Sequence, residues 1–248
     1  MILVSLRYYA TGSVKNLGGD VMDICQQSAS RIVTRISFLL AKKMKDFVHF
    51  PSTSEGITLI KQKFHEIAEF PDVVGCLDCT HIKIKSPGRN YAEAYKNRKG
   101  STQDNFIFNS SSLKKSLYCG EMEGILLGDS DYAVSPILMT PILSPINAAQ
   151  VRYNRSHAKT RSVVNKAFGI WKKRFKCLQI GMGIKLETAV AVICACATLH
   201  NLAIISKDTM EPFLHYEEEE QETVQVESEN IHSSGFAARD ALVHKFFQ

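Results

Sequence analysis

Residues 73–85 constrain the fold more than any other stretch, because they combine the pattern of a strand with a single acid in its middle. The stretch begins with apolar residues. Further on, Ile82 and Ile84 alternate with polar neighbours, a period of two that is typical of a half-buried strand. A buried carboxylate, here Asp78, costs several kcal/mol unless it is paired or bound to a metal. Asp78 is therefore predicted to be either a strand-end residue with a structural hydrogen bond or a metal ligand on the central strand of a nuclease-type sheet.

The composition is that of a globular chain with a basic body. A chain of 248 residues can form one large domain, or a medium-sized domain with a smaller second domain. Hydrophobic residues make up 45% of it. The net charge is +5, although residues 217–229 contain a dense run of glutamates. The rest of the chain is therefore distinctly basic, which is compatible with a nucleic-acid partner.

Two classes of protein do not fit the sequence. The seven cysteines are odd in number, and Cys76 and Cys79 form a C-x-x-C without a second ligand pair, so neither a disulfide framework nor a zinc site is predicted. No signal peptide is visible, and the apolar run 188–205 contains His200 and Asn201, which favours a buried helix over a membrane span. We expect a soluble intracellular protein with free thiols and no membrane contact.

The N-terminal residues predict a helical segment. Residues 1–12 have the pattern of a helix interior with no N-cap, so we expect this segment to be truncated at its start. A short helix at 20–24, a turn and a second helix at 28–45 follow, and Arg31 and Arg35 lie on the exposed side of the second helix. This pattern is typical of a DNA-binding helix-turn-helix, but also of an ordinary helical hairpin.

Acids stand at the ends of further predicted elements. An amphipathic helix is expected at residues 54–69, and a second buried strand from residue 125 ends in Asp129. The carboxyl end of a strand is a common place for a functional carboxylate, although Asp129 can equally be a turn residue. Asp104 is predicted either to cap the helix that follows it or to join the other acids.

The remaining segments are basic, apolar or acidic. A basic cluster at 96–100 suits a solvated loop or a phosphate-holding segment, and a loop with three prolines is expected at 133–150. A strongly basic helix at 155–175 and an apolar helix at 186–205 come next. The acidic tail is expected to be disordered, with a short helix possible at its end.

Together, Asp78, Asp104 and Asp129 suggest a metal-dependent phosphoryl-transfer site. In such sites divalent cations clamp the attacking and leaving oxygens of an in-line displacement. Magnesium prefers carboxylate oxygens and retains several water ligands. A basic helix that follows the acids would suit a nucleic-acid substrate.

A series of ordered motifs lies at 75–85, 95–100, 100–104, 126–132, 139–141, 153–154, 156–157 and 199–201. Between residues 5 and 205 the chain with these motifs resembles the Harbinger/PIF-type transposases and their domesticated nuclease relatives. The resemblance implies an α/β, RNase H-like DDE nuclease fold preceded by the helix-turn-helix-like segment. It also implies hydrolysis of DNA with a divalent cation, Mg or Mn, and strand transfer in the active transposases.

Matching the motifs residue by residue assigns the metal ligands and reveals one departure. By this resemblance Asp78, Asp104 and Asp129 are the catalytic acids and metal ligands, and a Glu should follow in the basic helix. Asn165 stands at that position. A neutral amide binds a divalent cation more weakly and cannot act as a base, so we expect catalysis to fall by about a hundredfold or more.

A second departure concerns the sheet. In the family a hairpin of two strands separates the motifs that here share Gly100. The fold is therefore expected to lack two central strands and to expose an unpaired strand edge. The expected domains are a helix-turn-helix-like segment at 1–50, the DDE nuclease domain at 51–205 and an acidic, disordered tail at 206–248.

The resemblance and the basic clusters together predict the partners. DNA is the expected ligand, and a Myb-like DNA-binding protein is a candidate partner, as for active relatives. The nucleus is the expected location, with the cytoplasm as a second one. The residues expected to contact DNA are Arg31, Arg35, Arg98, Lys99, Lys166, Lys172 and Lys173.

Three hypotheses about function follow from the sequence. The first is a transposase-derived, metal-dependent nuclease impaired by Asn165. The second is a catalytically dead protein that retains the fold and binds DNA or a partner. The third is a decaying gene copy that does not fold, motivated by the absent hairpin.

Overall fold

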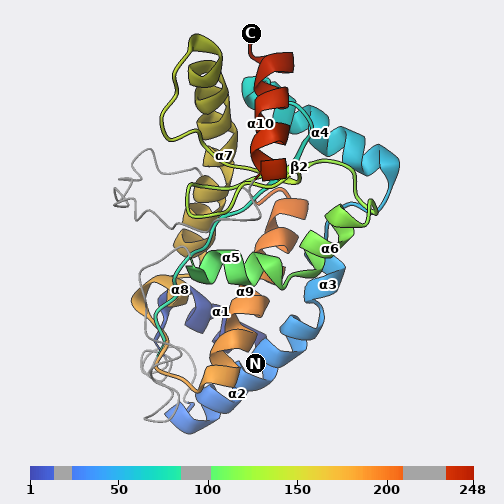
Figure 1. Ribbon diagram of the computed structural model, residues 1–248. Helices are drawn as coiled ribbons and strands as arrows, with labels where there is room; N and C mark the ends of the chain where they lie inside the picture. The colour runs from blue at the N-terminus through green and yellow to red at the C-terminus, as the bar shows by residue number, and fades with distance from the viewer. Residues whose placement is uncertain (14–23, 85–101, 209–232) are drawn as a thin grey trace. The chain divides into compact units, whose positions relative to one another are not determined.

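The computed structural model describes residues 1–13, 24–84, 102–208 and 233–248. The chain divides into two compact units, each assembled from segments that are distant in the sequence (Figure 1). Unit 1 combines Met1–Phe50, Thr80–Asn97 and Ala167–Tyr216, and unit 2 combines Pro51–Cys79, Arg98–Lys166 and Glu217–Gln248. The boundaries expected from the sequence at residues 50 and 205 divide the chain into consecutive segments instead.

The described part of unit 1 is mainly helical. Its elements are α1 (Ile2–Thr11), α2 (Gln26–Lys42), α3 (Met44–Phe47), α8 (Cys177–Ile180), α9 (Leu186–Ile205) and the last turns of α7 (Ala148–Arg174). Tyr8 of α1, Val33 of α2 and Val192 of α9 are buried in one apolar cluster. The hydroxyl groups of Tyr9 and Ser37 lie 2.7 Å apart inside it, so α1 and α2 are also joined by a buried hydrogen bond.

Helix α2 confirms the second helix of the predicted helix-turn-helix, although it begins at Gln26 and ends at Lys42. Its buried residues include Ala29 and Val33, and Arg31 and Arg35 are exposed. The first helix was expected at 20–24, mostly outside the described residues. The helix-turn-helix interpretation therefore remains a prediction.

Helix α9 lies where the apolar helix was expected. Among the described residues it is long and apolar enough to cross a membrane, a test that the core helix of a soluble protein also passes. Ala189, Val192, Ala195 and Cys196 of this helix are buried in the unit 1 cluster. This packing fits the buried helix predicted from the sequence.

Unit 2 is built on a small parallel sheet. Its elements are α4 (Ser54–Ala68), β1 (Val73–Cys76), α5 (Thr102–Asn109), α6 (Ser112–Tyr118), β2 (Ile125–Leu127), β3 (Leu138–Met139), most of α7 and α10 (Ser233–Phe246). The strand order is β1-β2-β3, and both neighbouring pairs are parallel. The fold of the described residues is thus a largely helical α/β arrangement.

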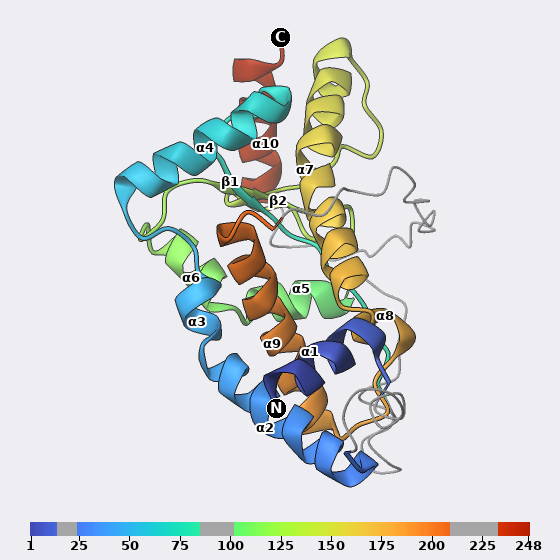
Figure 2. The same ribbon diagram turned by 180° about the vertical axis from the view of Figure 1, so that it is seen from behind.

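Both faces of this sheet are buried, as is usual for parallel sheets. Val73, Leu127 and Met139 belong to one apolar cluster, to which α4, α7 and α10 contribute (Figure 2). The neighbouring residues Val74, Leu126 and Leu138 belong to a second cluster with side chains of α5 and α6. Successive residues of each strand therefore point to opposite faces, as a period of two requires.

Helix α10 confirms the short helix that the sequence allowed at the end of the acidic tail. Val243 of this helix and Phe247 just after it are buried in the cluster with Phe70 and Tyr153. The buried Arg239 side chain donates a 3.0 Å hydrogen bond to the Pro141 carbonyl oxygen. The acidic run at 217–229 lies outside the described residues.

Three predicted elements have different limits in the structure. The strand expected at 73–85 ends at Cys76, because its described neighbour β2 ends at Leu127, so Asp78 lies beyond the strand rather than in its middle. The proline-containing loop includes β3, which pairs with β2. The basic helix begins at Ala148, where the Asn147 side chain accepts a hydrogen bond from the Gln150 N–H, as an N-cap does.

Candidate active site

Two acids follow the carboxyl ends of neighbouring parallel strands. Beyond β1, the Leu77 N–H donates a 2.7 Å hydrogen bond to the Leu127 carbonyl, and Asp78 comes next in the chain. Beyond β2, the Gly128 N–H donates to the Met139 carbonyl at 3.0 Å, and Asp129 comes next. Since β1 and β2 run in the same direction, the two carboxylates meet at one edge of the sheet.

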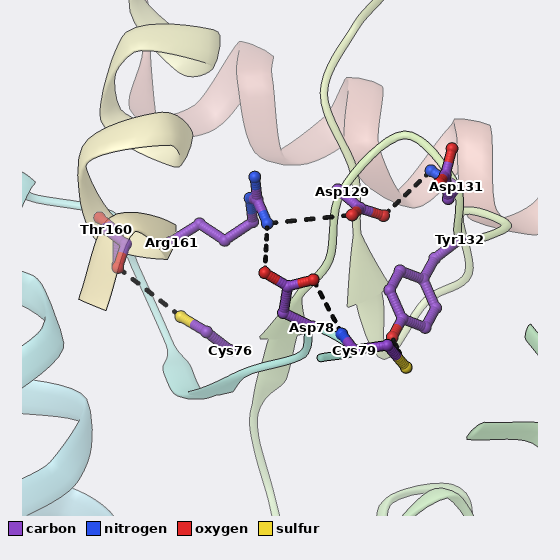
Figure 3. A network of polar contacts seen from close by, with 8 residues as sticks. All are labelled: Cys76, Asp78, Cys79, Asp129, Asp131, Tyr132, Thr160 and Arg161. Carbon is purple, nitrogen blue, oxygen red and sulfur yellow. Dashed lines mark hydrogen bonds and ion pairs between the residues drawn. The ribbon is translucent and has the colours of Figure 1, made fainter. Parts of the chain in front are cut away.

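Arg161 of α7 lies between these carboxylates (Figure 3). One guanidinium nitrogen, Nη1, is 3.5 Å from Oδ2 of Asp78 and 4.0 Å from Oδ2 of Asp129. The three side chains are 22%, 18% and 15% exposed, respectively. The site is therefore largely shielded from water, which strengthens the interactions among its charges.

Each carboxylate presents its other oxygen to the backbone. Oδ1 of Asp78 accepts a 2.8 Å hydrogen bond from the Cys79 N–H, and Oδ1 of Asp129 accepts one of 3.0 Å from the Asp131 N–H. These bonds fix the orientation of both carboxylates. The two Oδ2 atoms face the same positively charged group as a result (Figure 3).

Burial raises the pKa of Asp129 from 3.8 to about 6. The hydrogen bond from Asp131 and the charge of Arg161 oppose this rise, whereas the nearby charges of Asp131 and Asp78 add to it. The pKa thus shows that the surroundings compensate the negative charge of Asp129 only in part. A partly compensated, buried carboxylate is a suitable ligand for a further cation.

Helix α5 holds the loop that follows Asp129. The Asn105 side chain donates a 3.1 Å hydrogen bond to the Asp131 carbonyl and accepts one of 3.0 Å from the Ala133 N–H. Asp104 directly precedes Asn105 in α5, but its side chain lies outside the described part of the structure. Its assignment as a ligand remains a prediction.

Three side chains of α7 attach this helix to β3 and the segment after it. The Tyr153 hydroxyl donates to the Thr140 carbonyl at 2.9 Å, and His157 Nε2 lies 3.1 Å from the Met139 carbonyl oxygen. The Asn154 amide both donates to and accepts from the backbone of Ile142. These contacts give a structural role to two motifs of the resemblance and position the helical turn that carries Arg161.

The two cysteines near the acids contact other polar groups of the described residues. Burial raises the pKa of the Cys76 thiol to about 12, and this thiol lies 3.6 Å from the Thr160 carbonyl oxygen. The sulfur of Cys79 lies 3.5 Å from the Tyr132 hydroxyl. A thiol with so high a pKa stays neutral near pH 7 and is a weak nucleophile.

Asn165, the position of the expected Glu, lies on α7 four residues after Arg161. Residues four apart share one face of a helix, so Asn165 belongs to the face that Arg161 presents to the acids. Its side chain is half-buried. The structure thus brings Asp78 and Asp129 together beside the helix that carries Asn165, and the role of Asn165 at the site remains a prediction.

The predicted DNA-contacting residues are spread over several elements. Lys166 is exposed on α7, whereas Lys172 donates a 3.1 Å hydrogen bond to the His81 carbonyl and Lys173 is half-buried. Arg98 and Lys99 lie outside the described residues. Arg31 and Arg35, on α2, belong to unit 1.

Arg161 and Asp131 are site residues that the sequence patterns did not single out. Arg161 was treated as one of many basic residues of its helix, although its spacing of four from Asn165 could have indicated a shared face. Asp131 lies two residues after Asp129, and its N–H rather than its carboxylate makes the described contact with that residue. Neither role has a signature in composition or periodicity.

The donor set suits a hard divalent cation. No group of three or more His, Cys, Asp or Glu side chains that could hold a metal occurs among the described residues. Two carboxylates, Asp78 and Asp129, nevertheless turn oxygens toward one cationic group, and oxygen ligands of this kind are those that Mg²⁺ and Mn²⁺ prefer. The amide of Asn165 would be a third, uncharged oxygen donor.

Comparison with protein families gives an independent assignment. A family model described as "DDE superfamily endonuclease" matches residues 94–201. The matched region contains Asp129, Arg161 and Asn165 but begins after Asp78. A match to a DDE endonuclease domain implies an RNase H-like fold. No solved structure matched the chain.

Curated relatives match over most of the chain. The Bos taurus protein named "Putative nuclease HARBI1" is 33% identical over 232 residues, which cover 82% of this chain and 66% of the bovine protein. The Xenopus laevis protein of that name is 30% identical over 82% of this chain and 67% of its own length. The Arabidopsis thaliana "Protein ALP1-like" is 21% identical over 84% of this chain and 61% of its own length.

The bovine relative contains positions that are missing from this chain. The alignment with it runs over 232 positions but takes up only 82% of the 248 residues here, so some positions of the relative have no counterpart in this chain. The chain spans about two thirds of that relative's length. With these matches and the paired acids, the chain belongs to the Harbinger transposase-derived nuclease family, within the DDE superfamily of endonucleases.

Proposed function

We propose that this protein is a transposase-derived nuclease that hydrolyses phosphodiester bonds of DNA with the help of Mg²⁺ or Mn²⁺. The observation that supports it best is the convergence of Asp78 and Asp129 beyond the ends of adjacent parallel strands. The names of several relatives contain the word nuclease, and DDE superfamily endonucleases generally use divalent metals. Both facts favour the same activity here.

In this proposal Asp78, Asp104 and Asp129 hold the divalent cation, with Asn165 as a further, neutral donor. When bound, such an ion polarises the phosphoryl oxygen and lowers the pKa of a coordinated water. The hydrogen bonds from the Cys79 and Asp131 N–H groups keep the two carboxylates in position without rearrangement. Preorganised groups of this kind are what electrostatic catalysis requires.

A basic stripe on α7 offers a surface for the DNA backbone. Arg155, Lys159 and Lys166 are exposed and follow one another at spacings of four and seven residues, so they share one side of the helix. Lysine and arginine side chains hold phosphates without reading sequence. Arg155 and Lys159 extend the contact set that was expected from the sequence, in which α7 contributes Lys166, Lys172 and Lys173.

The activity should be low because Asn165 replaces a carboxylate. Removal of one electrostatic group from a catalytic site typically costs about 10²–10³ in rate. A Glu in this position would add a charged oxygen ligand on the helical face shared with Arg161. The proposal therefore predicts that activity is limited by this residue.

A plasmid-nicking assay in Mn²⁺ with three proteins tests the proposal. The wild type should nick slowly, Asp78→Ala should be inactive, and Asn165→Glu should be faster by about a hundredfold. Lys159→Gln, which leaves the acids intact, should weaken DNA binding rather than abolish nicking at saturating DNA. If the wild type and Asn165→Glu are both inert while folded, the nuclease proposal is wrong.

A catalytically dead DNA-binding protein is the second candidate function. Asn165 favours it, and so does Arg161, because one carboxylate charge at the acid pair is already neutralised. In that case gel-shift binding should weaken when Arg31 and Arg35 are replaced by glutamine, in a protein that never nicks DNA. Nicking that disappears with Asp78→Ala would exclude this candidate.

Location and partners are further parts of the proposal. A transposase-derived nuclease with DNA as its substrate should reach the nucleus, and a Myb-like protein would supply sequence-specific DNA binding. A fluorescent fusion that never enters the nucleus would contradict the first point. Failure to co-purify with any DNA-binding protein from nuclear extract would contradict the second.

A further inference from the structure

Arg161 faces both carboxylates of the described acid pair. Its Nη1 atom faces Oδ2 of Asp78 at 3.5 Å and Oδ2 of Asp129 at 4.0 Å. The Oδ1 atoms of the same carboxylates accept hydrogen bonds from backbone N–H groups. The second oxygen of each carboxylate, Oδ2, is the one that Arg161 faces (Figure 3).

The distances show that the guanidinium group is shared rather than tightly bound. Charge-assisted hydrogen bonds between a guanidinium and a carboxylate are about 2.7–2.9 Å long and often bidentate. Both distances from Arg161 exceed this range, and a single nitrogen makes both contacts. Such an arrangement holds two acids together but is not optimised for either of them.

The charges make Arg161 and a divalent cation competitors. Asp78 and Asp129 together carry two negative charges, and position 165 adds none because it is an asparagine. Arg161 offsets part of the charge of this pair and so weakens its attraction for a further cation. A metal ion between the two Oδ2 atoms would also be repelled by the guanidinium at close range in a shielded site.

We propose that Arg161 is a built-in counter-cation that holds the acid pair together in the metal-free protein and must withdraw before a divalent cation binds. It is a positioning residue rather than a catalytic one, and it sets the metal affinity of the site. This inference rests on the proposed nuclease function. Asn165 strengthens the effect, because no carboxylate at that position balances the positive charge.

Calorimetric titration of the folded protein with MnCl₂ measures the competition directly. Arg161→Gln should bind Mn²⁺ at least about tenfold more tightly than the wild type, because a positive charge beside the ion is removed. Arg161→Lys retains that charge and should bind as weakly as the wild type. Lys115→Gln removes an exposed lysine of α6 that belongs to neither the metal site nor the proposed DNA-contacting set, so it should leave the affinity unchanged and controls for net charge.

A second measurement uses the wild type alone, in case Arg161→Gln does not fold. In protein labelled with ¹⁵N-arginine, addition of Mg²⁺ should shift the Nε–H resonance of Arg161 as the side chain withdraws. The midpoint of this shift should equal that of Mg²⁺ binding measured by calorimetry. An Arg161 resonance that stays unchanged while Mg²⁺ binds would overturn the inference.

The outcomes separate this inference from the nuclease proposal. If the wild type binds Mn²⁺ and folded Arg161→Gln binds it no more tightly, Arg161 is not a competitor, and the nuclease proposal remains. If neither protein binds Mn²⁺, both are overturned. Loss of binding in Asp78→Ala confirms that the titration reports this site.

Discussion

At the scale of single residues, His157 connects the helix that carries Arg161 to strand β3. Its ring is buried, and Nε2 lies 3.1 Å from the Met139 carbonyl oxygen. Burial lowers the pKa of His157 from 6.5 to about 4, against the opposing effect of the Met139 hydrogen bond. A neutral imidazole whose Nε2 carries the proton can donate this hydrogen bond.

The lowered pKa predicts how stability depends on pH. Between pH 6.5 and about 4 the unfolded protein binds a proton at residue 157 that the folded protein does not, so acid destabilises the fold. The full effect is roughly 3 kcal/mol, complete below pH 4 and absent above 6.5. Urea unfolding at several pH values should therefore show that wild type loses more stability in this range than His157→Gln, which cannot ionise.

Comparison of wild type with His157→Gln separates the contribution of His157 to the pH dependence from that of other titrating groups. Burial also lowers the pKa of His200. His200 and Asp129 are present in wild type and in His157→Gln, so their contributions cancel when the two stability curves are subtracted. His65→Gln removes an exposed histidine and should retain the wild-type pH dependence. Parallel pH curves for wild type and His157→Gln would contradict the prediction.

At the scale of elements, α10 completes the core of unit 2 and depends on one glycine. A Cβ atom on Gly235 would lie 2.5 Å from the Val134 carbonyl oxygen and 2.7 Å from its carbon. These are backbone atoms that cannot move as a side chain can. The first turn of α10 therefore approaches the segment before β3 as closely as only glycine allows.

Gly235→Ala should displace α10 and destabilise unit 2. The strain, and with it the partial exposure of Val243 and Phe247, should cost about 2–4 kcal/mol. Thermal unfolding measures the loss, and limited proteolysis should then cut the α10 segment sooner. Gly183→Ala is the matched control, because a Cβ there would meet no atom within 4 Å. Equal melting temperatures for the two variants would contradict this account.

The elements also show how far sequence patterns reach. Helix α4 follows from its apolar periodicity, α9 from its long continuous apolar run, and β2 from its short apolar run before Gly128. The two-residue strand β3 could not be predicted, because hydrogen bonds to β2 define it rather than any local pattern. Asp78 was placed in the middle of a strand because alternation of residues cannot reveal where the pairing partner ends.

The candidate site was predictable only in part for a similar reason. Asp78 and Asp129 came from motifs, and the structure brings them together as expected. The role of Arg161 depends on the meeting of α7 with two strand ends, which no local signal encodes. For the same reason the Tyr153, Asn154 and His157 motifs gave no hint that they attach α7 to β3 and the segment after it.

At the scale of the whole molecule, the distribution of charge should modulate DNA binding. The net charge is +5 although residues 217–220 are four consecutive glutamates. A negative segment on the same chain competes with phosphate for basic side chains, and salt screens both interactions. The acidic run should therefore lower the affinity for DNA without contacting it.

Replacing residues 217–220 with glutamine should raise DNA affinity at low salt. We expect about a fivefold gain near 50 mM salt that disappears near 0.5 M, because the effect is electrostatic. Fluorescence anisotropy with a labelled duplex measures both values. A variant with aspartate at the same four positions retains the charge and should bind like the wild type; a gain in that variant would show that charge is not the cause.

The sheet edge connects the architecture with the comparisons. In the described residues β1 pairs only with β2, so its other side has no strand beside it. The absence of a hairpin next to this strand was expected from the sequence. The alignment with the bovine relative contains positions that have no counterpart here but assigns them to no particular stretch, so the missing hairpin stays a prediction.

The rings of Phe70 and Phe247 lie 5.5 Å apart. This contact between distant parts of the sequence affects how the protein folds during its synthesis. Ribosomes add roughly 5–20 residues per second, so the apolar sheet face completed by β3 waits several seconds for α10 to be synthesised. During that interval the nascent chain exposes a surface to which chaperones bind. The yield of this protein in a cell should therefore depend on the speed of translation and the supply of chaperones as much as on its final stability.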